Sequence, residues 1–367
     1  MTLSARAPLK VSAIVPYPSG ASAGQRFRVE QWSRLLGEDR LEVTFHPLFT
    51  HSDFQRLYVA GARLEKSART VRALIRRLAE TLSFGRPDVV FLYREAFPLG
   101  PAVLEALLAK RHPIVYDFDD AIWLGDTSAA NRWIAPLKHP QKVANIIEAA
   151  TATTVGNSYL AAYARTRSES VQVIPTTIDV DQYFPKTIRK ERRGVRIAWT
   201  GSPTTARFLS QLEQALRPLL RRPDCELVVI GEPRFEIPGA ANVLAVPWSE
   251  AVELELLQSV DIGIMPMPDD PWTRGKCGFK ALLYMALGVA TIASPVGVNR
   301  EIIVNGVNGL LAGSEQEWVD AITLLTEDPV LRAQLGAAGR ETVVDRYSGQ
   351  QWAETFYGVL STAATHR

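Results

Sequence analysis

The feature that most constrains this chain is the repeated alternation of short, nearly continuous apolar runs with amphipathic helical stretches. The runs are rich in Val, Ile and Leu and lack the apolar–polar alternation of a half-exposed strand, so they suit strands buried on both faces of a parallel sheet. Strand–helix alternation through most of the chain predicts an α/β fold with doubly wound sheets. The predicted strands are 11–15, 43–45, 89–93, 114–118, 153–155 and 171–174 in the first half, and 195–200, 227–230, 243–246, 262–265 and 291–293 in the second. Helical stretches such as 101–110 and 209–220 fill the gaps.

The length predicts two domains, because 367 residues exceed the roughly 150 residues that one domain typically holds. Segment 186–194 is basic, nearly free of apolar residues and placed between two series of strands, which indicates an inter-domain connection. We therefore expect a first domain at 1–185, a second at 186–345, and a C-terminal helix at 346–367 that can pack back on the first domain.

Composition excludes several classes of protein. With 47% apolar and 22% charged residues, the chain is neither disordered nor fibrous, and two cysteines cannot staple it. No apolar run approaches the roughly 20 residues that span a bilayer, and the first ten residues lack a signal-peptide core. We expect a soluble cytoplasmic protein with no nucleic-acid partner, since no aromatic residues interleave with the basic linker.

The formal net charge of +2 hides an uneven distribution. Residues 1–185 carry 22 Lys/Arg against 18 Asp/Glu, and segment 56–77 holds seven of these cations with a single acid, Glu65. A basic amphipathic helix of this kind can lie on an anionic membrane surface, which would place the protein at the inner face of the membrane. A surface helix with solvated arginines is an equally good interpretation.

In the first half, polar residues follow three predicted strands. A small-residue loop after 11–15 contains Gly24, Arg26 and Arg28, and strand 89–93 ends in Arg94 and Glu95. Because ligands bind at the carboxyl ends of strands in open α/β sheets, these are candidate ligand contacts. A plain turn and a local ion pair are the alternatives.

The third segment is acidic. Asp117, Asp119 and Asp120 come at the end of strand 114–118, and three carboxylates so close together are costly unless a cationic or polar group faces them. An N-cap role explains one aspartate but not three. The segment contains a D-x-D sequence, which holds a divalent metal in one class of sugar transferases, so a metal-dependent site is a further alternative.

In the second half, two glycine-containing segments precede helices and are candidate anion sites. Gly201 and Ser202 follow strand 195–200, with Arg207 about one turn into the next helix. Glycines and lysines also crowd the start of an apolar helix that ends at Gly288. Backbone N–H groups, the positive helix end and lysine side chains suit a diphosphate. The residues of this second segment are Gly275, Lys276, Gly278 and Lys280.

The second half resembles the retaining, GT-B-fold glycosyltransferases of family 4, the glycosyl transferases group 1. The resemblance rests on an ordered series of motifs: V-D-I-G-I-M-P at 260–266, the helix from Gly278 to Gly288, A-S-P-V-G-V-N-R-E at 293–301, and N-G-V-N-G at 305–309. In the first half, V-I-P-T-T-I-D at 173–179 resembles the family's segment before the inter-domain linker.

The resemblance implies two Rossmann-like domains that face each other across a cleft, with acceptor contacts mainly from the first and donor contacts from the second. It also implies transfer from a nucleotide-diphosphate sugar with retention of anomeric configuration, and neither a cofactor nor a bound metal. The family's spaced pair of glutamates falls on Gly275 and Leu283, and Ser202 and Arg207 stand where the family uses Arg and Lys. Where many members place a histidine, this chain has Asp119, followed by Asp120. These departures indicate a divergent subgroup.

Two functions follow from the sequence. The first is a glycosyltransferase that moves a sugar to a glycan, a lipid-linked saccharide or a secondary metabolite. Here Asp119 and Asp120 are the predicted catalytic residues, and Gly24, Arg26, Arg28, Arg94 and Glu95 the predicted acceptor contacts. Gly201, Ser202, Arg207, Gly275, Lys276, Gly278 and Lys280 are the predicted donor contacts. The second is a catalytically silent nucleotide-binding or scaffold protein of the same fold, which the missing glutamates favour.

Overall fold

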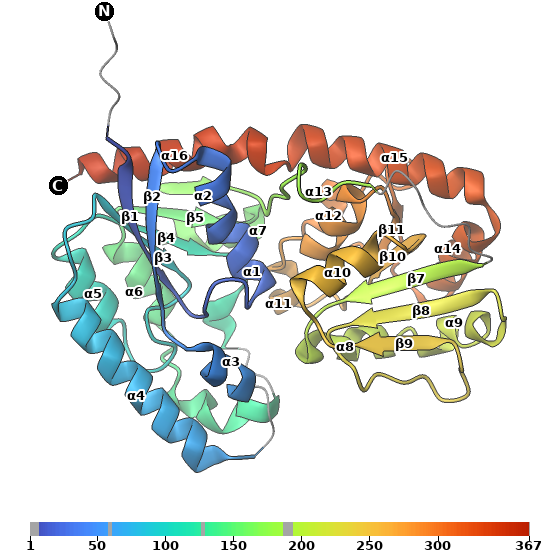
Figure 1. Ribbon diagram of the computed structural model, residues 1–367, viewed down its shortest axis with the longest axis horizontal. Helices are drawn as coiled ribbons and strands as arrows, with labels where there is room; N and C mark the ends of the chain where they lie inside the picture. The colour runs from blue at the N-terminus through green and yellow to red at the C-terminus, as the bar shows by residue number, and fades with distance from the viewer. Residues whose placement is uncertain (1–6, 58–60, 126–128, 186–193, 367) are drawn as a thin grey trace, which may run out of the picture. The chain divides into compact units, whose positions relative to one another are not determined.

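The computed structural model describes residues 7–57, 61–125, 129–185 and 194–366 (Figure 1). The chain divides into two compact units: unit 1 comprises residues 1–176 with 352–367, and unit 2 comprises 177–351. The sequence placed the domain boundaries at 185 and 345 instead. The predicted linker at 186–194 lies, except for its last residue, outside the described residues.

Unit 1 is built on a six-stranded sheet with the order β2-β1-β3-β4-β5-β6. All neighbouring strands pair in parallel. The central strands β3 and β4 are buried at every position, which explains why all their residues except Asp117 are apolar or aromatic. The strands are β1 (Leu9–Val15), β2 (Leu41–Pro47), β3 (Val89–Tyr93), β4 (Ile114–Phe118), β5 (Ala152–Val155) and β6 (Val171–Val173).

The helices of unit 1 alternate with these strands. They are α1 (Ala23–Gln25), a π-helical turn η1 (Arg26–Glu30), α2 (Gln31–Leu36), α3 (His51–Leu57), α4 (Arg63–Leu82) and α5 (Val103–Ala109). Further along come the 3₁₀ segments η2 (Ile122–Leu124) and η3 (Ala129–Leu137), then α6 (Lys142–Ala149) and α7 (Ser158–Arg165). The side chain of Asn157 caps α7 by accepting a hydrogen bond from the Leu160 N–H at 2.9 Å.

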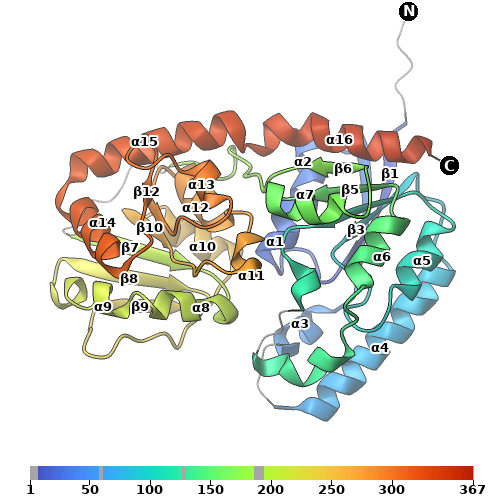
Figure 2. The same cartoon turned by 180° about the vertical axis from the view of Figure 1, so that it is seen from behind.

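The C-terminal helix α16 (Gly349–Thr365) completes the core of unit 1, and Figure 2 shows it running along that unit's sheet. The ring of Phe356 stacks on Trp32 with centroids 4.5 Å apart and meets Phe91 edge-on at 5.4 Å. All three side chains are buried. The end of the chain therefore packs with strands near its beginning.

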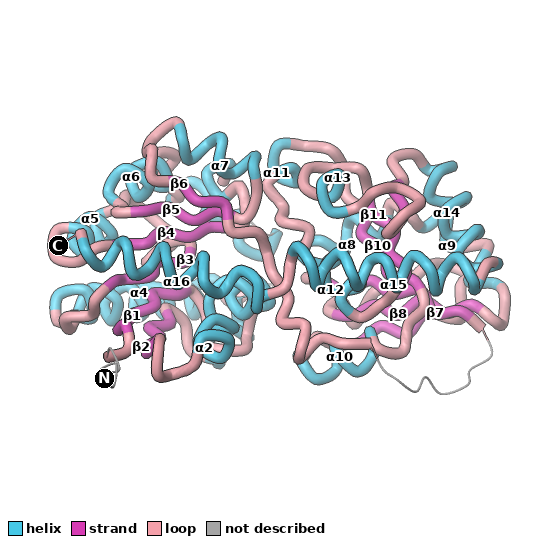
Figure 3. The backbone as a smooth tube through the Cα atoms, turned by 90° about the horizontal axis from the view of Figure 1, so that it is seen from above, coloured by secondary structure: helices cyan, strands magenta, loops and turns pink. Residues whose placement is uncertain are grey.

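Unit 2 contains a second six-stranded sheet, with the order β12-β11-β10-β7-β8-β9. Again all neighbouring strands are parallel, and Figure 3 shows the strands of each unit side by side between helices. The strands are β7 (Val195–Thr200), β8 (Cys225–Ile230), β9 (Val243–Val246), β10 (Ile262–Met265), β11 (Ala290–Ala293) and β12 (Leu310–Leu311). Two doubly wound parallel sheets confirm the predicted α/β fold class.

The helices of unit 2 are mostly short, and longer ones follow the last strand. They are α8 (Pro203–Ser210), α9 (Glu213–Leu216), the 3₁₀ turn η4 (Leu219–Arg221), α10 (Glu250–Leu257), α11 (Pro271–Arg274), α12 (Phe279–Ala286), α13 (Asn299–Ile302), α14 (Glu315–Glu327) and α15 (Pro329–Arg346). The prediction of one helix over 209–220 was wrong: the chain forms the end of α8, then α9 and η4. Pro218 lacks a backbone N–H and cannot continue α9. Strand β12 was not predicted, because two residues carry no periodicity.

No helix within the described ranges is both long and apolar enough to cross a membrane.

Candidate functional site

The strand orders locate one switch point in each sheet. In unit 1 the connections reverse direction between β1 and β3, and in unit 2 between β10 and β7. Loops at the carboxyl ends of strands leave a ligand crevice at such a point. The predicted site residues follow β1, β3 and β4 in unit 1, and β7 and β10 in unit 2.

The loop after β1 is braced by two side chains that sequence reasoning missed. Gln25 is fully buried; its Nε2 donates to the Tyr17 carbonyl at 2.8 Å and to Glu30 Oε1 at 2.7 Å, and its Oε1 accepts from the Tyr17 N–H. The other oxygen of Glu30 accepts from the N–H of Gly20 at 3.0 Å. The loop is therefore held in one conformation by the helix that follows it. That helix contains the π turn η1, a feature frequent at functional sites.

Arg94 joins the acidic segment to β3. Its Nε and Nη2 donate to Asp119 Oδ1 at 3.1 and 2.8 Å, and Nη2 also donates to Asp120 Oδ2 at 2.8 Å. The hydroxyl of Tyr93 donates to the same Asp119 oxygen at 2.9 Å. Arg94 has a left-handed backbone with φ of 64°, a conformation rare outside glycine and concentrated at functional positions.

Gly24 lies against the cluster formed by Tyr93, Arg94, Asp119 and Asp120. Because glycine has no side chain, it leaves room for these residues. A Cβ atom at Gly24 would lie 2.7 Å from the Tyr93 hydroxyl and 3.0 Å from Asp119 Oδ2. The structure thus brings together four residues from three predicted segments, which follow β1, β3 and β4, and adds the hydroxyl group of Tyr93, the last residue of β3. The four are Gly24, Arg94, Asp119 and Asp120.

The electrostatics of the cluster keep Asp119 ionised. Burial acts to raise the pKa of its carboxyl group, but the charges of Arg94 and Arg28 and the hydrogen bonds from Arg94 and Tyr93 outweigh burial. The net pKa of Asp119 therefore lies below its usual value. An ionised carboxylate with 12% of its side chain exposed can accept hydrogen bonds from the hydroxyl groups of a sugar or acceptor.

Arg28 and Asp117 form a buried ion pair instead of an open contact surface. Arg28 Nε donates to Asp117 Oδ2 at 3.0 Å, its Nη2 contacts Oδ1, and its Nη1 donates to the carbonyl of Ile174. Thr154 donates to Asp117 as well, at 2.6 Å. The pair ties the helix after β1 to β4 and β5. With Arg26 also buried, the acceptor contacts predicted for Arg26 and Arg28 stay predictions, and both arginines lie inside the unit.

Two arginines therefore neutralise the charges of the three closely spaced aspartates. Arg28 faces Asp117, and Arg94 faces Asp119 and Asp120. The described residues contain no group of three or more His, Cys, Asp or Glu side chains placed to hold a metal ion.

The side chain of Glu95 has different neighbours from that of Arg94. It is partly buried and lies near Lys142, Lys138 and Glu105, while Arg94 turns toward the aspartates. Burial raises the pKa of Glu95 to about 7; Lys142 opposes the rise and Glu105 adds to it. A carboxyl group that titrates near neutral pH beside a strand end suits proton transfer.

In unit 2 the carboxyl end of β7 is closely packed. A Cβ atom on Gly201 would lie 2.6 Å from the Trp199 ring, and one on Gly231 would lie 1.8 Å from the Gly201 carbonyl oxygen. The hydroxyl of Tyr284 on α12 accepts from the N–H of Thr200 at 3.0 Å. Ser202 is exposed at the N-terminus of α8, whose first helical residue is Pro203.

The segment before α12 is shaped by caps and glycines. Asp270 and Thr273 form a capping box on α11. Gly278 has φ of 70°, and a Cβ atom there would lie 2.3 Å from Ile302 Cδ1. Only glycine fits this turn, which leads directly into the N-terminus of α12.

Aromatic rings position the cations of unit 2. The Lys276 ammonium lies 3.8 Å from the centroid of Trp272, and that of Lys280 lies 5.6 Å from Trp199. Arg207 is exposed on α8 beside Phe208, whose ring is 6.3 Å from Trp272. The structure thus gathers the predicted basic residues along the ends of β7 and β10. Both tryptophans were missed, because single aromatic residues carry no spacing signal.

The resemblance predicts that Gly275 and Leu283 stand where the family carries its two glutamates. Gly275 and Leu283 are both buried, the latter completely. The nearby buried acid is Glu253 on α10, whose Oε1 accepts from the Thr200 hydroxyl at 2.5 Å. Glu253 comes from a different part of the chain, so no local motif could have identified it.

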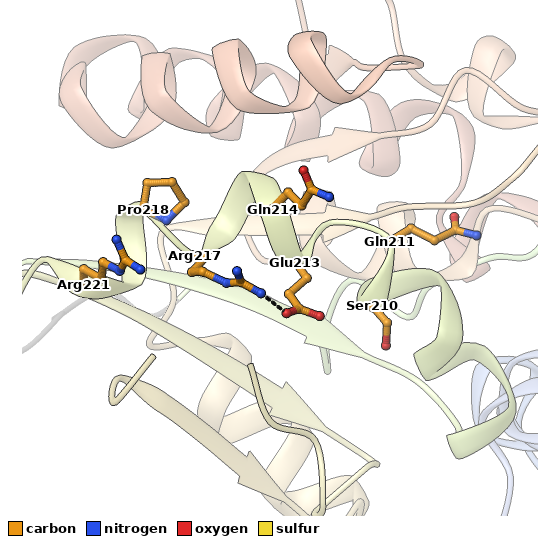
Figure 4. A pocket seen from close by; sticks show the side chains of 7 residues that line it. All are labelled: Ser210, Gln211, Glu213, Gln214, Arg217, Pro218 and Arg221. Carbon is orange, nitrogen blue, oxygen red and sulfur yellow. Dashed lines mark hydrogen bonds and ion pairs between the residues drawn. The ribbon is translucent and has the colours of Figure 1, made fainter. Parts of the chain in front are cut away.

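A hollow of about 700 Å³ on unit 2 is separate from these residues. Figure 4 shows its lining from the end of α8 to η4, with Arg217 paired to Glu213. Its lining residues follow no strand end, so it is not the candidate donor site.

Two parallel α/β sheets with polar loops at their carboxyl ends define the class: the GT-B architecture that the sequence predicted. The solved structure of sucrose-phosphate synthase from Thermosynechococcus elongatus matches with a TM-score of 0.70, 15% identity, and coverage of 98% of this chain and all of that one. Anabaena HepE in complex with UDP-glucose matches with a TM-score of 0.65, 14% identity, and coverage of 98% and 100%. At these identities the matches show the fold.

Sequence comparison indicates what reaction the second half of the chain supports. Residues 194–328 match the family model described as "Glycosyl transferases group 1". A curated relative, the GDP-mannose-dependent monoacylated α-(1-6)-phosphatidylinositol monomannoside mannosyltransferase of Corynebacterium glutamicum, is 28% identical over 158 residues. The alignment spans 38% of this chain and 40% of that relative. These findings support a glycosyltransferase.

Proposed function

We propose that this protein transfers a sugar from a nucleotide-diphosphate donor, with retention of anomeric configuration, to a glycan, a lipid-linked saccharide or a secondary metabolite. The observation that carries the proposal is the pair of lysines at the start of α12, Lys276 and Lys280, with a third cation, Arg207, on α8. The relatives add support, since HepE was solved with UDP-glucose and the corynebacterial relative is named as GDP-mannose-dependent.

The leaving nucleotide diphosphate develops negative charge as the sugar–oxygen bond breaks. Oriented N–H groups at the N-terminus of α12 and the nearby lysine side chains can stabilise that charge without reorganising. The turn at Gly278 allows a phosphate to approach the backbone closely. In this proposal no metal and no cofactor take part, and the donor is a co-substrate.

The acceptor side of the proposal rests on unit 1. Asp119, held ionised by Arg94, and Asp120 orient hydroxyl groups, and Glu95 lies at the adjacent strand end. We include contact between segment 56–77 and a membrane in this proposal, as a route to a lipid-linked acceptor.

Binding of nucleotides tests the donor site directly. UDP, GDP, TDP and CMP are added to the whole protein, and the rise in melting temperature is measured, because a ligand of the native state raises it. We expect one diphosphate to bind best and Lys276→Ala to weaken it roughly 10- to 100-fold, the usual effect of losing a hydrogen bond to a charged group.

The control is Arg234→Ala, which removes a cation that is 89% exposed elsewhere on unit 2. It should bind the nucleotide as the unchanged protein does. Equal binding and turnover by the Lys276→Ala variant would reject the donor site.

A catalytically silent nucleotide-binding or scaffold protein remains the second candidate. It is favoured by one observation: Gly275 and the buried Leu283 stand where the family carries acids that contact the donor. Tight nucleotide binding without transfer or hydrolysis, across a panel of nucleotide-sugars and acceptors, would establish it in place of the enzyme.

A further inference from the structure

Helix α4 buries mainly polar side chains and exposes most of its large apolar side chains. Its buried residues are Lys66, Ala73, Arg77 and Thr81. Its outer face exposes Leu64 (89%), Val71 (55%), Ile75 (63%), Leu78 (41%) and Leu82 (58%). A surface helix of a globular protein ordinarily has the reverse arrangement.

The inversion has a local cause. The Arg77 guanidinium donates to the carbonyls of Val15 at 3.3 Å, His46 at 2.8 Å and Ala96 at 3.2 Å, which lie at or just after the ends of β1, β2 and β3. Arg76 donates to the Leu48 carbonyl. Buried carbonyls need hydrogen-bond donors, so this side of α4 must be basic and the apolar side faces out.

The outward residues form one continuous stripe. Leu64, Val71 and Leu78 are spaced seven residues apart, and Ile75 and Leu82 repeat the same spacing one turn further along. On a helix this stripe runs about 30 Å, from one end of α4 to the other. Contiguous apolar surface of this kind marks an interaction site, whereas singly scattered apolar residues do not.

The stripe ends at a basic hollow of about 780 Å³. Leu82 lines both, and Arg111 donates to the Leu82 carbonyl at 3.1 Å. The cationic or titratable residues of the lining are Arg86, Lys110, Arg111, His112 and His366, and the described residues that line the hollow include no acid. Arg63 and Arg72 are exposed along the stripe itself.

We propose that the apolar stripe of α4 and this basic hollow together form a docking surface for an anionic lipid bilayer. The apolar side chains enter the boundary between headgroups and acyl chains, and the cations meet lipid phosphates. This inference rests on the proposed function only in one respect: docking on a bilayer would bring the enzyme to a lipid-linked acceptor.

The observations favour a bilayer over a second copy of the chain. A stripe one helix wide offers far less than the roughly 800 Å² that each partner contributes to a stable interface. Antiparallel pairing about its centre would also bring the two copies of Arg72 together, and like charges repel.

The surface differs from the one that segment 56–77 suggested. Lys66 and Arg77 are buried, and Arg69 pairs with Asp53 at 2.7 Å and with Glu65 at 3.0 Å. The lipid-facing cations are therefore Arg63, Arg72, Arg86 and Lys110, half of which lie outside that segment.

Co-sedimentation with vesicles tests the proposal on the full chain without any donor. We expect binding to vesicles of phosphatidylglycerol and phosphatidylcholine in equal parts, and weak binding to phosphatidylcholine alone. The double variant Val71→Ser/Ile75→Ser should bind at least tenfold more weakly, because two apolar side chains no longer leave water. Arg86→Gln/Lys110→Gln should lose roughly fivefold for each charge, and only on the anionic vesicles.

Matched controls keep the test specific. Val307→Ser/Val330→Ser removes two side chains that are 60% and 64% exposed on unit 2 and should not change binding. The charge-conserving variant Arg86→Lys/Lys110→Arg should bind anionic vesicles as the unchanged protein does.

Equal binding by the α4 double variant, or absence of binding by the unchanged protein, overturns the proposal. So does concentration-dependent dimerisation that the α4 variant abolishes, since the stripe would then bind a second copy. If the unchanged protein binds vesicles but transfers no sugar from any donor, the proposed function is rejected and the membrane inference stands.

Discussion

Arg94 donates two hydrogen bonds to a single oxygen of Asp119, from Nε at 3.1 Å and from Nη2 at 2.8 Å, although the residues are separated by 25 positions. The contact joins the ends of β3 and β4, and a third hydrogen bond from Nη2 holds Asp120. One guanidinium thus fixes both carboxylates predicted to be catalytic.

Replacing Arg94 with Gln should destabilise unit 1 by about 3 kcal/mol, because two partly buried carboxylates lose their counter-charge. The effect depends on pH. The lowered pKa of Asp119 contributes stability that is present above the ordinary pKa of an aspartate and is lost as the pH falls through the lowered value. Denaturation at several pH values should show the difference between variant and unchanged protein shrinking in acid.

The control for this variant is Arg167→Gln, which breaks an ion pair with Glu148 that is exposed on both sides. It should change the unfolding free energy by less than about 1 kcal/mol. If the Arg94 and Arg167 variants both lower the free energy of unfolding by equally small amounts, Arg94 does not hold the acidic segment in place.

Replacing Gly24 with Ala should impair turnover on the acceptor side. The new methyl group would lie 2.7 Å from the Tyr93 hydroxyl and 3.0 Å from Asp119 Oδ2, so one of them must move. We expect kcat/KM for the acceptor to fall roughly 10- to 100-fold, as displacements of about 1 Å do at reacting centres. Nucleotide binding should be unchanged.

A suitable control is Gly358→Ala, where the added methyl group meets nothing within 4 Å. Steady-state kinetics with each variant separates the two cases. Normal acceptor kinetics in the Gly24 variant would show that the acceptor does not depend on this cluster.

Glu95→Gln should alter how stability varies with pH. The pKa of Glu95 is raised to about 7, so the folded state holds a proton that the unfolded chain releases near pH 4.3. The contribution of Glu95 is therefore full in acid and is lost as the pH rises toward about 7. The groups that face it are Lys142, Lys138, Glu105 and Arg94.

Melting temperatures between pH 5 and pH 8 measure this effect. Relative to the unchanged protein, the Gln variant should gain stability as the pH rises, because its amide never ionises. A constant difference across that range would mean that Glu95 does not titrate there.

Phe356→Ala should destabilise unit 1 by about 3–5 kcal/mol, since it leaves a cavity between Trp32 and Phe91. Chemical denaturation followed by tryptophan fluorescence measures the loss. Phe184→Ala, at a side chain that is 48% exposed on unit 2, is the matched control and should have a small effect. Equal effects would mean that α16 is not part of the core of unit 1.

Much of the fold could be predicted because it depends on local pattern. Strands β3, β4, β7, β9 and β10 have the predicted bounds, since each is a largely apolar run. The candidate donor residues also cluster in sequence, at 201–207 and 275–280, where close packing requires glycine at Gly201 and a left-handed backbone favours it at Gly278.

The acceptor-side cluster could be predicted only in part. Arg94, Asp119 and Gly24 were each identifiable as residues near strand ends, but their mutual contacts depend on which strands are neighbours. The sequence treats Arg94 and Glu95 as a pair, whereas the left-handed backbone at Arg94 sends the two side chains to different partners.

The sequence by itself determined the α/β class, the two parallel sheets and the apolar stripe with its arginines on one helix. Only the tertiary structure decided which side of α4 faces out and which arginines are buried. Helical periodicity defines two faces but not their orientation, and here the carbonyls of Val15, His46 and Ala96 required donors that Arg77 supplies. That need for buried hydrogen bonds, which no local pattern records, turned the apolar face of the helix toward solvent.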